Sequence, residues 1–306
     1  MSKRILITGG SGFIGSRLIT DWLNAGHQVV VFTRRPSQVI QRWDGQLRAT
    51  DNLAQLNELF DWLVNLAGEG IADQRWSSRR KDVLRQSRVD LTRDLLQWAK
   101  QSQQSFELVL SGSAVGYYGS FRDDLYQGNS LTEADGHGAG FAAHLCRDWE
   151  HIAEEFTSCS ERLVLLRTGI VLGPRGGMLK RLWLPFSVGL GGVIGAGNQV
   201  LSWIDLEDYV SAIHHITGSL LQGTINMTAP KAVTNREFTR ALAAELKRPA
   251  LFPMPKVIAK LLFGEMSELL LEGQRVQPQQ LLQSGFQYKF VNLEQSLQRI
   301  HHDWSR

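Results

Sequence analysis

The sequence predicts an α/β fold built on a doubly wound parallel sheet. The strongest reason lies at its start, where the apolar run Ile5–Ile7 leads into a glycine-rich turn and apolar residues then recur at helical spacing. Runs typical of buried strands alternate with helix-like stretches from there to residue 166. Strands that alternate with helices pair in parallel, because the chain crosses back over the sheet between them.

The opening unit has the pattern of a βαβ motif that binds a dinucleotide. The apolar residues after the glycine turn recur at helical spacing and predict a helix that ends at Gly26. Gln28–Phe32 is expected to be a second buried strand. Glycine has no Cβ, so backbone amides in such a turn approach a pyrophosphate closely, and the helix N-terminus favours the anion. We therefore expect a Rossmann-type domain, with cofactor contacts from Gly9, Ser11, Gly12, Phe13, Ile14 and Gly15.

The residues after the second strand indicate which dinucleotide is bound. An NAD site places an acidic residue about 20 residues after the glycines, whereas a 2′-phosphate requires a cation there. This chain has Thr33 and Arg34, and a guanidinium donates several hydrogen bonds to phosphate. NADP(H) is therefore the expected cofactor. Arg35 precedes Pro36 and is expected only to solvate the loop.

Further strands and helices follow in alternation. Strands are expected at Trp62–Leu66, Leu108–Leu110 and Leu163–Leu166, and helices from about Ser78 to Lys100 and from Ala142 to about Phe156. Ligands of such sheets bind beyond the carboxyl ends of the strands. We therefore assign to the cofactor site the residues that end or follow two strands: Leu66, Ala67, Gly68, Glu69 and Ser111.

Composition excludes several classes of partner. The charge is +3, with 33 basic and 30 acidic residues well mixed, which does not favour nucleic acid. No apolar run reaches the roughly 18 residues that span a bilayer, so no membrane partner is expected. The two cysteines, Cys146 and Cys159, show no metal-ligand spacing and, without a signal peptide, predict a reduced, cytoplasmic protein with no metal site.

Several motifs together resemble a known group of enzymes. The turn Thr8–Gly15, the segment Asn65–Gly68 and the segment Ser111–Ala114 are similar to the extended short-chain dehydrogenase/reductase superfamily. Longer matches, including Asn65–Glu69, Arg75-Trp76, Arg167–Gly169 and Leu271–Val276, resemble an atypical subgroup called the "epimerase family", which has an uncharacterised C-terminal domain. The resemblance implies an NADP-binding domain over 1–175, with 198–230 returning to it, and a smaller substrate-side lobe over 176–197 and 231–306.

The second half of the chain shows weaker patterns. Thr234 and Glu237 have the spacing of a capping box, and the helical pattern that they open is expected to continue through Phe263. Trp203 is expected either to stack on a substrate or to lie in the core.

The catalytic helix departs from the superfamily pattern. The superfamily uses Tyr-x-x-x-Lys on one helix face, where the ammonium lowers the pKa of the phenol. Here Ala142 and Cys146 stand at those two positions, Ser113 keeps the place of the upstream serine, and Arg88 stands where an Asn is usual. Arg88 can supply a cation near the lost lysine and is assigned to the cofactor site, but it stays protonated and is no acid or base.

The catalytic candidates are Ser113, Cys146 and Tyr117. Cys146 is either a buried packing residue or a catalytic thiol, and Tyr117 either lines the site or forms a structural corner. Two functions follow: an NADP-dependent oxidoreductase or epimerase acting on a small carbonyl or hydroxyl compound, such as a nucleotide sugar, or an NADP(H)-binding sensor that has lost catalysis. A small-molecule substrate is the expected partner, and a homodimer stays open.

Overall fold

The structure is a computed structural model that describes residues 2–121 and 130–304. The strands are β1 (Arg4–Thr8), β2 (Gln28–Phe32), β3 (Arg48–Thr50), β4 (Trp62–Asn65), β5 (Leu108–Ala114), β6 (Leu163–Thr168), β7 (Ile170–Leu172), β8 (Val200–Leu201), β9 (Trp203–Asp205), β10 (Gly223–Met227) and β11 (Val233–Thr234). The helices are α1 (Phe13–Asn24), α2 (Pro36–Arg42), α3 (Ser78–Arg85), α4 (Leu91–Gln101), α5 (Phe141–Glu154), α6 (Leu179–Ser187), α7 (Leu206–Thr217), α8 (Asn235–Glu245), α9 (Lys256–Phe263), α10 (Glu268–Leu271), α11 (Gln279–Gln283) and α12 (Leu293–Trp304).

The main sheet confirms the predicted fold class. Its strands lie in the order β10-β6-β5-β4-β1-β2-β3, and every neighbouring pair is parallel. The chain winds outward from β1 to β3 and then returns to the other side of β1 as β4. The carboxyl ends of β1 and β4 therefore diverge at a topological switch point, where ligands of this fold bind.

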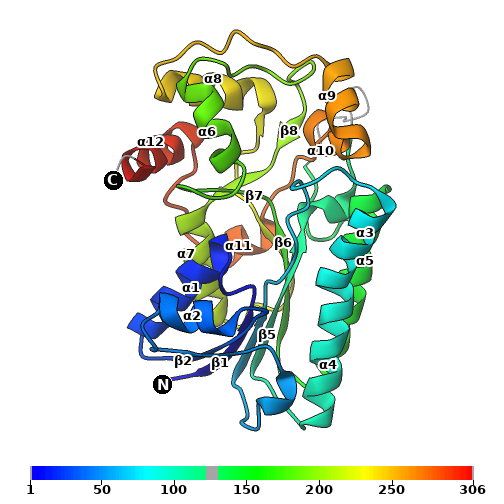
Figure 1. The fold of residues 1–306 in the computed structure, drawn as a ribbon, viewed down its shortest axis with the longest axis vertical. Helices are drawn as coiled ribbons and strands as arrows, with labels where there is room; N and C mark the ends of the chain where they lie inside the picture. The colour runs from blue at the N-terminus through cyan, green and yellow to red at the C-terminus, as the bar shows by residue number, and fades with distance from the viewer. Residues whose placement is uncertain (1, 122–129, 305–306) are drawn as a thin grey trace.

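Helices cover both faces of the sheet (Figure 1). Alternating strand residues point to opposite faces: Ile5 and Ile7 belong to the apolar core shared with α1 and α7, whereas Leu6 belongs to the core shared with α4 and the end of α5. Because both faces are covered, the strands are apolar almost throughout, as is typical of parallel sheets.

The smaller lobe has its own apolar core. Helices α6, α8 and α12 enclose it together with the short strands β7, β8 and β9. Trp203 lies in this core at 1% exposure and donates its indole N–H to the Lys231 carbonyl, so it is a core residue. Leu281 and Phe286, from the tail that we expected in the lobe, lie instead in the core of the main sheet.

Two expected helices are interrupted. The helix expected over 78–100 contains a π-helical turn at Gln86–Asp90 between α3 and α4. The capping box of Thr234 and Glu237 is confirmed, but the expectation of continuous helix through Phe263 is wrong, because α8 ends at Glu245. Prolines at 249, 253 and 255 remove backbone donors that a helix requires, so α9 begins only at Lys256. In the described part of the chain, no helix is long and apolar enough to cross a membrane.

Candidate functional site

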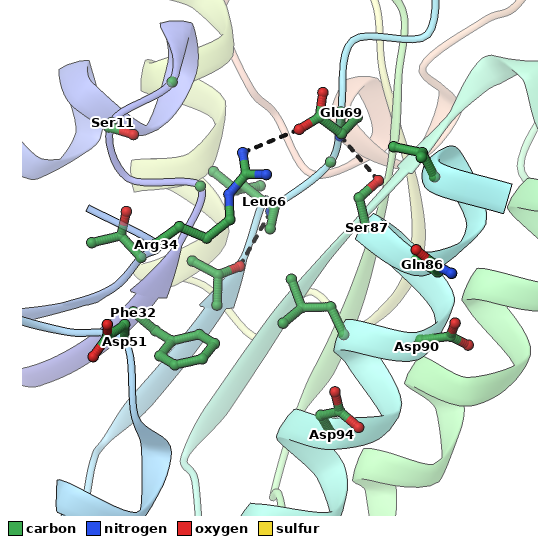
Figure 2. A pocket seen from close by; sticks show the side chains of 18 residues that line it. Ser11, Phe32, Arg34, Asp51, Leu66, Glu69, Gln86, Ser87, Asp90 and Asp94 are labelled. Carbon is green, nitrogen blue, oxygen red and sulfur yellow. Dashed lines mark hydrogen bonds and ion pairs between the residues drawn. The ribbon is translucent and has the colours of Figure 1, made fainter. Parts of the chain in front are cut away.

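A cavity of about 590 Å³ lies at the switch point (Figure 2). It is lined by residues predicted from the sequence: Gly9, Ser11, Gly12, Thr33, Arg34, Leu66, Ala67, Gly68 and Glu69. These come from the turn after β1, the end of β2 and the loop after β4. The structure therefore brings three separate segments of the predicted cofactor site together.

The glycine turn is shaped by close backbone contacts. Gly9 has φ +69°, and a Cβ on it would lie 2.5 Å from the Leu66 carbonyl oxygen, while a Cβ on Gly15 would collide with the carbonyl of Gly9. The Gly12 N–H donates to the Gly9 carbonyl at 3.0 Å, and no side chain caps α1. The amides of the first turn of α1 are thus available to an anion.

Two of the predicted cofactor residues contribute backbone rather than side chain. The Phe13 ring lies against Gly173 and Gly176, and both Phe13 and Ile14 pack against the core of the main sheet. Neither side chain lines the cavity. Their role at an anion is limited to their amides at the start of α1.

A second cavity, of about 360 Å³, opens beside the first. It shares Ser11, Thr33 and Arg34 with the first cavity and adds further residues from α2 and the preceding loop: Arg35, Gln38, Val39 and Arg42. Arg42 donates to the Ser11 carbonyl at 3.2 Å, and its guanidinium carbon lies 4.8 Å from the centroid of the Trp43 ring. Three arginines therefore line this second cavity, at the end of β2 where the sequence predicts a 2′-phosphate.

Arg35, which was expected to solvate the loop, is exposed and also lines this second cavity. The sequence reasoning missed Arg42, since it lies at the end of α2 rather than at a strand end. Arg34 extends across the first cavity to Glu69, with an N–O distance of 3.1 Å (Figure 2).

Glu69, on the loop after β4, contacts three arginines. Besides Arg34, its carboxylate faces Arg80 at 3.6 Å, and its carbonyl accepts from Arg88 at 2.9 Å. The Glu69 N–H donates to the Ser87 hydroxyl at 3.1 Å. Ser87 and Arg88 both belong to the π-helical turn, which turns them toward this loop.

Arg88 does not line the cavity. Its guanidinium lies against Gly68, where an added Cβ would be 2.9 Å from Cζ, and stacks 5.5 Å from the centroid of Trp149. Burial lowers the pKa of Arg88. Arg88 therefore holds the Gly68–Glu69 backbone next to the position of the lost lysine.

Ser113 takes part in a buried polar network. Its hydroxyl donates to Glu150, which also accepts two hydrogen bonds from Arg167 at 2.9 Å each. Arg167 donates in turn to the hydroxyl of Tyr118, which donates to Asn226. Ser113, Arg167 and Asn226 lie side by side on β5, β6 and β10, so the sheet register builds this network.

Tyr117 lies over this network and is only half-buried. The guanidinium carbon of Arg167 is 3.4 Å from the centroid of its ring, a cation–π contact. Unlike Tyr118, Tyr117 makes no hydrogen bond through its hydroxyl to any residue that the structure describes. Of the two tyrosines, Tyr117 is the one whose hydroxyl has no partner among the described residues, and neither Tyr117 nor Ser113 lines the two cavities.

Cys146 is buried at 4% exposure. Burial, followed by the nearby Glu150 carboxylate, raises the pKa of its thiol to about 12. Ala142 is equally buried, and a Cβ added to Gly116 would lie at van der Waals distance from both side chains. This environment favours the packing interpretation over a catalytic thiolate, because a reactive thiol needs access and a lowered pKa.

Ser111 is fully buried and does not line the cavity. Its hydroxyl has no hydrogen-bond partner among the described residues. Its place on β5, next to Asn65 on β4, sets it below the floor of the site.

Several residues lining the first cavity were missed. These are Phe32, Asp51, Val83, Gln86, Ser87, Asp90, Leu91 and Asp94. Gln86, Asp90 and Asp94 recur every four residues and so share one face of the helical segment, a signal that the sequence contained. Asp51 follows β3, a strand too short to show a pattern. Among the described residues, no group of three His, Cys, Asp or Glu side chains could hold a metal ion.

Comparisons with known proteins agree with this geometry. The model of the NAD dependent epimerase/dehydratase family matches residues 5–227, and a domain of unknown function matches residues 254–300. An epimerase family protein of Mycobacterium bovis is 39% identical over 297 residues, covering 96% of each chain. The human epimerase family protein SDR39U1 is 35% identical over 302 residues, covering 97% of this chain and 99% of the relative.

Solved structures extend the comparison. The crystal structure of human SDR39U1 with NADPH superposes with a TM-score of 0.86 at 32% identity, covering 98% of this chain and 99% of that chain. A UDP-galactose 4-epimerase superposes with a TM-score of 0.74 at 17% identity, covering 99% and 98%, which shows the shared fold alone. The glycine turn, the parallel sheet and these full-length matches lead to one conclusion: the chain belongs to the NAD dependent epimerase/dehydratase family, in the form that carries this C-terminal domain of unknown function.

Proposed function

We propose that this chain binds NADP(H) and transfers hydride between it and a small carbonyl or hydroxyl compound, with nucleotide sugars as the leading substrate class. The observation that carries the proposal is the arginine-lined cavity beside the glycine turn. Arg34, Arg35 and Arg42 line the second cavity at the end of β2, where an NAD site would place a carboxylate.

The residues present fit the cofactor. The cradle at Gly9 and Gly12 has no room for a larger side chain at Gly9, and the amides that begin α1 face an incoming pyrophosphate. Asp51 adds a carboxylate to the lining of the first cavity, where it could accept a hydrogen bond from an amino group of the cofactor. The crystal structure of the human relative with NADPH supports the same assignment.

NADPH supplies a hydride when bound, and the chain must then supply a proton at the reacting oxygen. Tyr117 is our candidate for this role, because its hydroxyl is available and its ring is fixed over Arg167. Ser113, a catalytic candidate from the sequence, donates its hydroxyl to Glu150 instead of presenting it to a substrate. We therefore assign Ser113 the role of positioning Glu150 and Arg167 beneath Tyr117.

A sensor without catalysis is the second candidate. It is favoured by the burial of Ala142 and Cys146 at the positions of the missing dyad, and by the engagement of Ser113 within the protein. Such a protein would change its partners or its assembly with the redox state of the cofactor.

Turnover separates the two functions. Purified protein is incubated with NADPH and a panel of small carbonyl compounds that includes keto-sugar nucleotides, while NADPH absorbance is followed. The enzyme proposal expects steady oxidation that Tyr117→Phe reduces at least tenfold, with NADPH affinity unchanged. Failure of NADPH to bind would contradict the cofactor assignment, whereas binding without turnover, together with a redox-dependent change in assembly, would support the sensor.

A further inference from the structure

Exposed apolar side chains gather on the smaller lobe. Most of the large apolar residues that are exposed in the described part of the chain lie in two segments, 178–197 and 246–263. They are Leu184, Val188, Leu190, Leu251, Phe252, Val257, Ile258, Leu261 and Leu262. Elsewhere such residues are widely separated along the chain, as at Leu59 and Leu220, which is ordinary for a protein surface.

The two segments contact each other along 187–194 and 248–254, and we call their exposed apolar side chains together the lobe face. Leu190 forms an antiparallel bridge with Ala250, and the Phe252 N–H donates to the Gly191 carbonyl at 3.1 Å. Arg248 donates to the Ser187 carbonyl at 3.0 Å. The chain then enters α9, which follows the loop that crosses the lobe after α8 (Figure 1).

Helix α9 is turned with its apolar face outward. Ala259 is fully buried and Phe263 packs against a neighbouring core, which fixes the helix on the protein. Val257 and Leu261, one turn apart, are 75% and 71% exposed, and Ile258 and Leu262 are exposed beside them. A surface helix ordinarily buries such a stripe, so this face lacks its apolar partner.

The charges of the lobe face indicate what that partner is. Neither segment contains Asp or Glu, although the chain has 30 acidic residues. Lys247, Arg248, Lys256 and Lys260 instead surround the apolar side chains, and all four are exposed. A second copy of the chain would bring these cations together across a two-fold axis, which like-charge repulsion opposes. A partner with an apolar interior and a negatively charged surface matches both the exposed apolar side chains and these cations.

We propose that the lobe face docks on an anionic lipid bilayer. Aliphatic side chains from α9 and the adjoining loop enter the boundary between headgroups and acyl chains, while the lysines remain at the level of the phosphates. This contact is peripheral, needs no spanning helix and is independent of the cofactor site. A bilayer also requires no matching shape, which suits a surface built from parts of the short helices α6 and α9 and the loops next to them.

Vesicle flotation of the full chain tests the proposal. The protein is mixed with vesicles of phosphatidylcholine alone or of phosphatidylcholine rich in phosphatidylglycerol. We expect binding to the anionic vesicles that Lys256→Gln and Lys260→Gln each weaken about fivefold. Leu261→Gln is expected to weaken it about tenfold. The matched control is Leu220→Gln, which alters a leucine 91% exposed outside the lobe face and should leave binding unchanged.

Two further measurements are made on each variant: light scattering determines the oligomeric state, and the melting temperature reports whether the variant is folded. Unchanged melting temperatures show that lost binding does not come from unfolding. Absence of flotation with anionic vesicles, or equal flotation of wild type and Leu261→Gln, would overturn the proposal. A dimer that Leu261→Gln dissociates would also overturn it, because a second copy would then cover the lobe face.

Discussion

Removing the Arg34 guanidinium should weaken NADPH binding selectively. A charge-assisted hydrogen bond to a 2′-phosphate contributes about 1.5–3 kcal/mol. Arg34 must first release Glu69, and its side chain is 89% exposed, so that ion pair offsets at most about 1 kcal/mol. The net contribution is about 0.5–3 kcal/mol, and Arg34→Ala should therefore lower the affinity for NADPH about two- to 150-fold.

Calorimetry with NADPH and NADH measures this selectivity. NADH lacks the 2′-phosphate, so its affinity should change much less in Arg34→Ala. Arg48→Ala is a matched control, since Arg48 is also an exposed arginine paired with a glutamate, Glu58, but lies on β3 at the edge of the sheet and lines neither cavity. Glu69→Gln should raise NADPH affinity slightly in the wild type and not in Arg34→Ala, because only the wild type has the competing pair.

Two results would refute this reasoning. Equal losses for NADPH and NADH would show that Arg34 acts on the cofactor as a whole, for example by stacking, and not on a 2′-phosphate. Equal affinity of the wild type for both cofactors would remove the basis for assigning the arginine-lined cavity to phosphate.

Three further outcomes follow from the geometry. Gly12→Ala should weaken the binding of both cofactors at least tenfold, because the added Cβ lies at the lining of the cofactor cavity. The melting temperature should change little, because this Cβ would meet only the Gly9 carbonyl, at 3.1 Å. Stabilisation by NADPH equal to that of the wild type in thermal shift would contradict this prediction. Burial raises the pKa of Cys146 to about 12, so the folded thiol stays neutral while the unfolded thiol ionises near pH 9. The contribution of this thiol to the free energy of unfolding is therefore fully present below about pH 9 and is lost as the pH rises. Between pH 9 and 10 the wild type should lose about 1 kcal/mol more than Cys146→Ala in urea titrations. The same pH dependence of the unfolding free energy in both proteins would show an accessible thiol. Glu150→Gln should cost about 3 kcal/mol of unfolding free energy, because it leaves buried Arg167 without its counter-ion. The double variant Glu150→Gln/Arg167→Met should recover part of this loss. A loss in the double variant equal to the sum of the two single-variant losses would show that the pair is not coupled.

Much of the cofactor site could be predicted from local sequence. Glycines at Gly9 and Gly12, a following helix and cations after β2 are neighbours in the chain, and a βαβ unit places neighbours in one site. Arg42 and Gln86 escaped prediction because they reach the cavities from helices, where the residues that face a ligand depend on how the helix is rotated. Gln86 begins a π-helical turn, Gln86–Asp90, that was not predicted, although its four-residue spacing to Asp90 and Asp94 was visible in the sequence.

The catalytic candidates show the other limit. The sequence showed that Ala142 and Cys146 replace a Tyr-Lys dyad, and it offered Ser113 and Tyr117 in their place. It did not show that Ser113 donates to Glu150, because this bond joins β5 to α5 across 37 residues. Which of two adjacent tyrosines has an available hydroxyl also depended on the position of Arg167, a residue of β6.

The sequence by itself determined the fold class, the glycine turn and the cationic end of β2, because periodicity and local backbone chemistry act between residues close in the chain. Tertiary structure alone decided that three arginines share one cavity, that Cys146 is enclosed and that α9 faces outward with its leucines exposed. Burial and charge pairing depend on which distant segments pack together. A pattern of residue types along one chain does not contain that information.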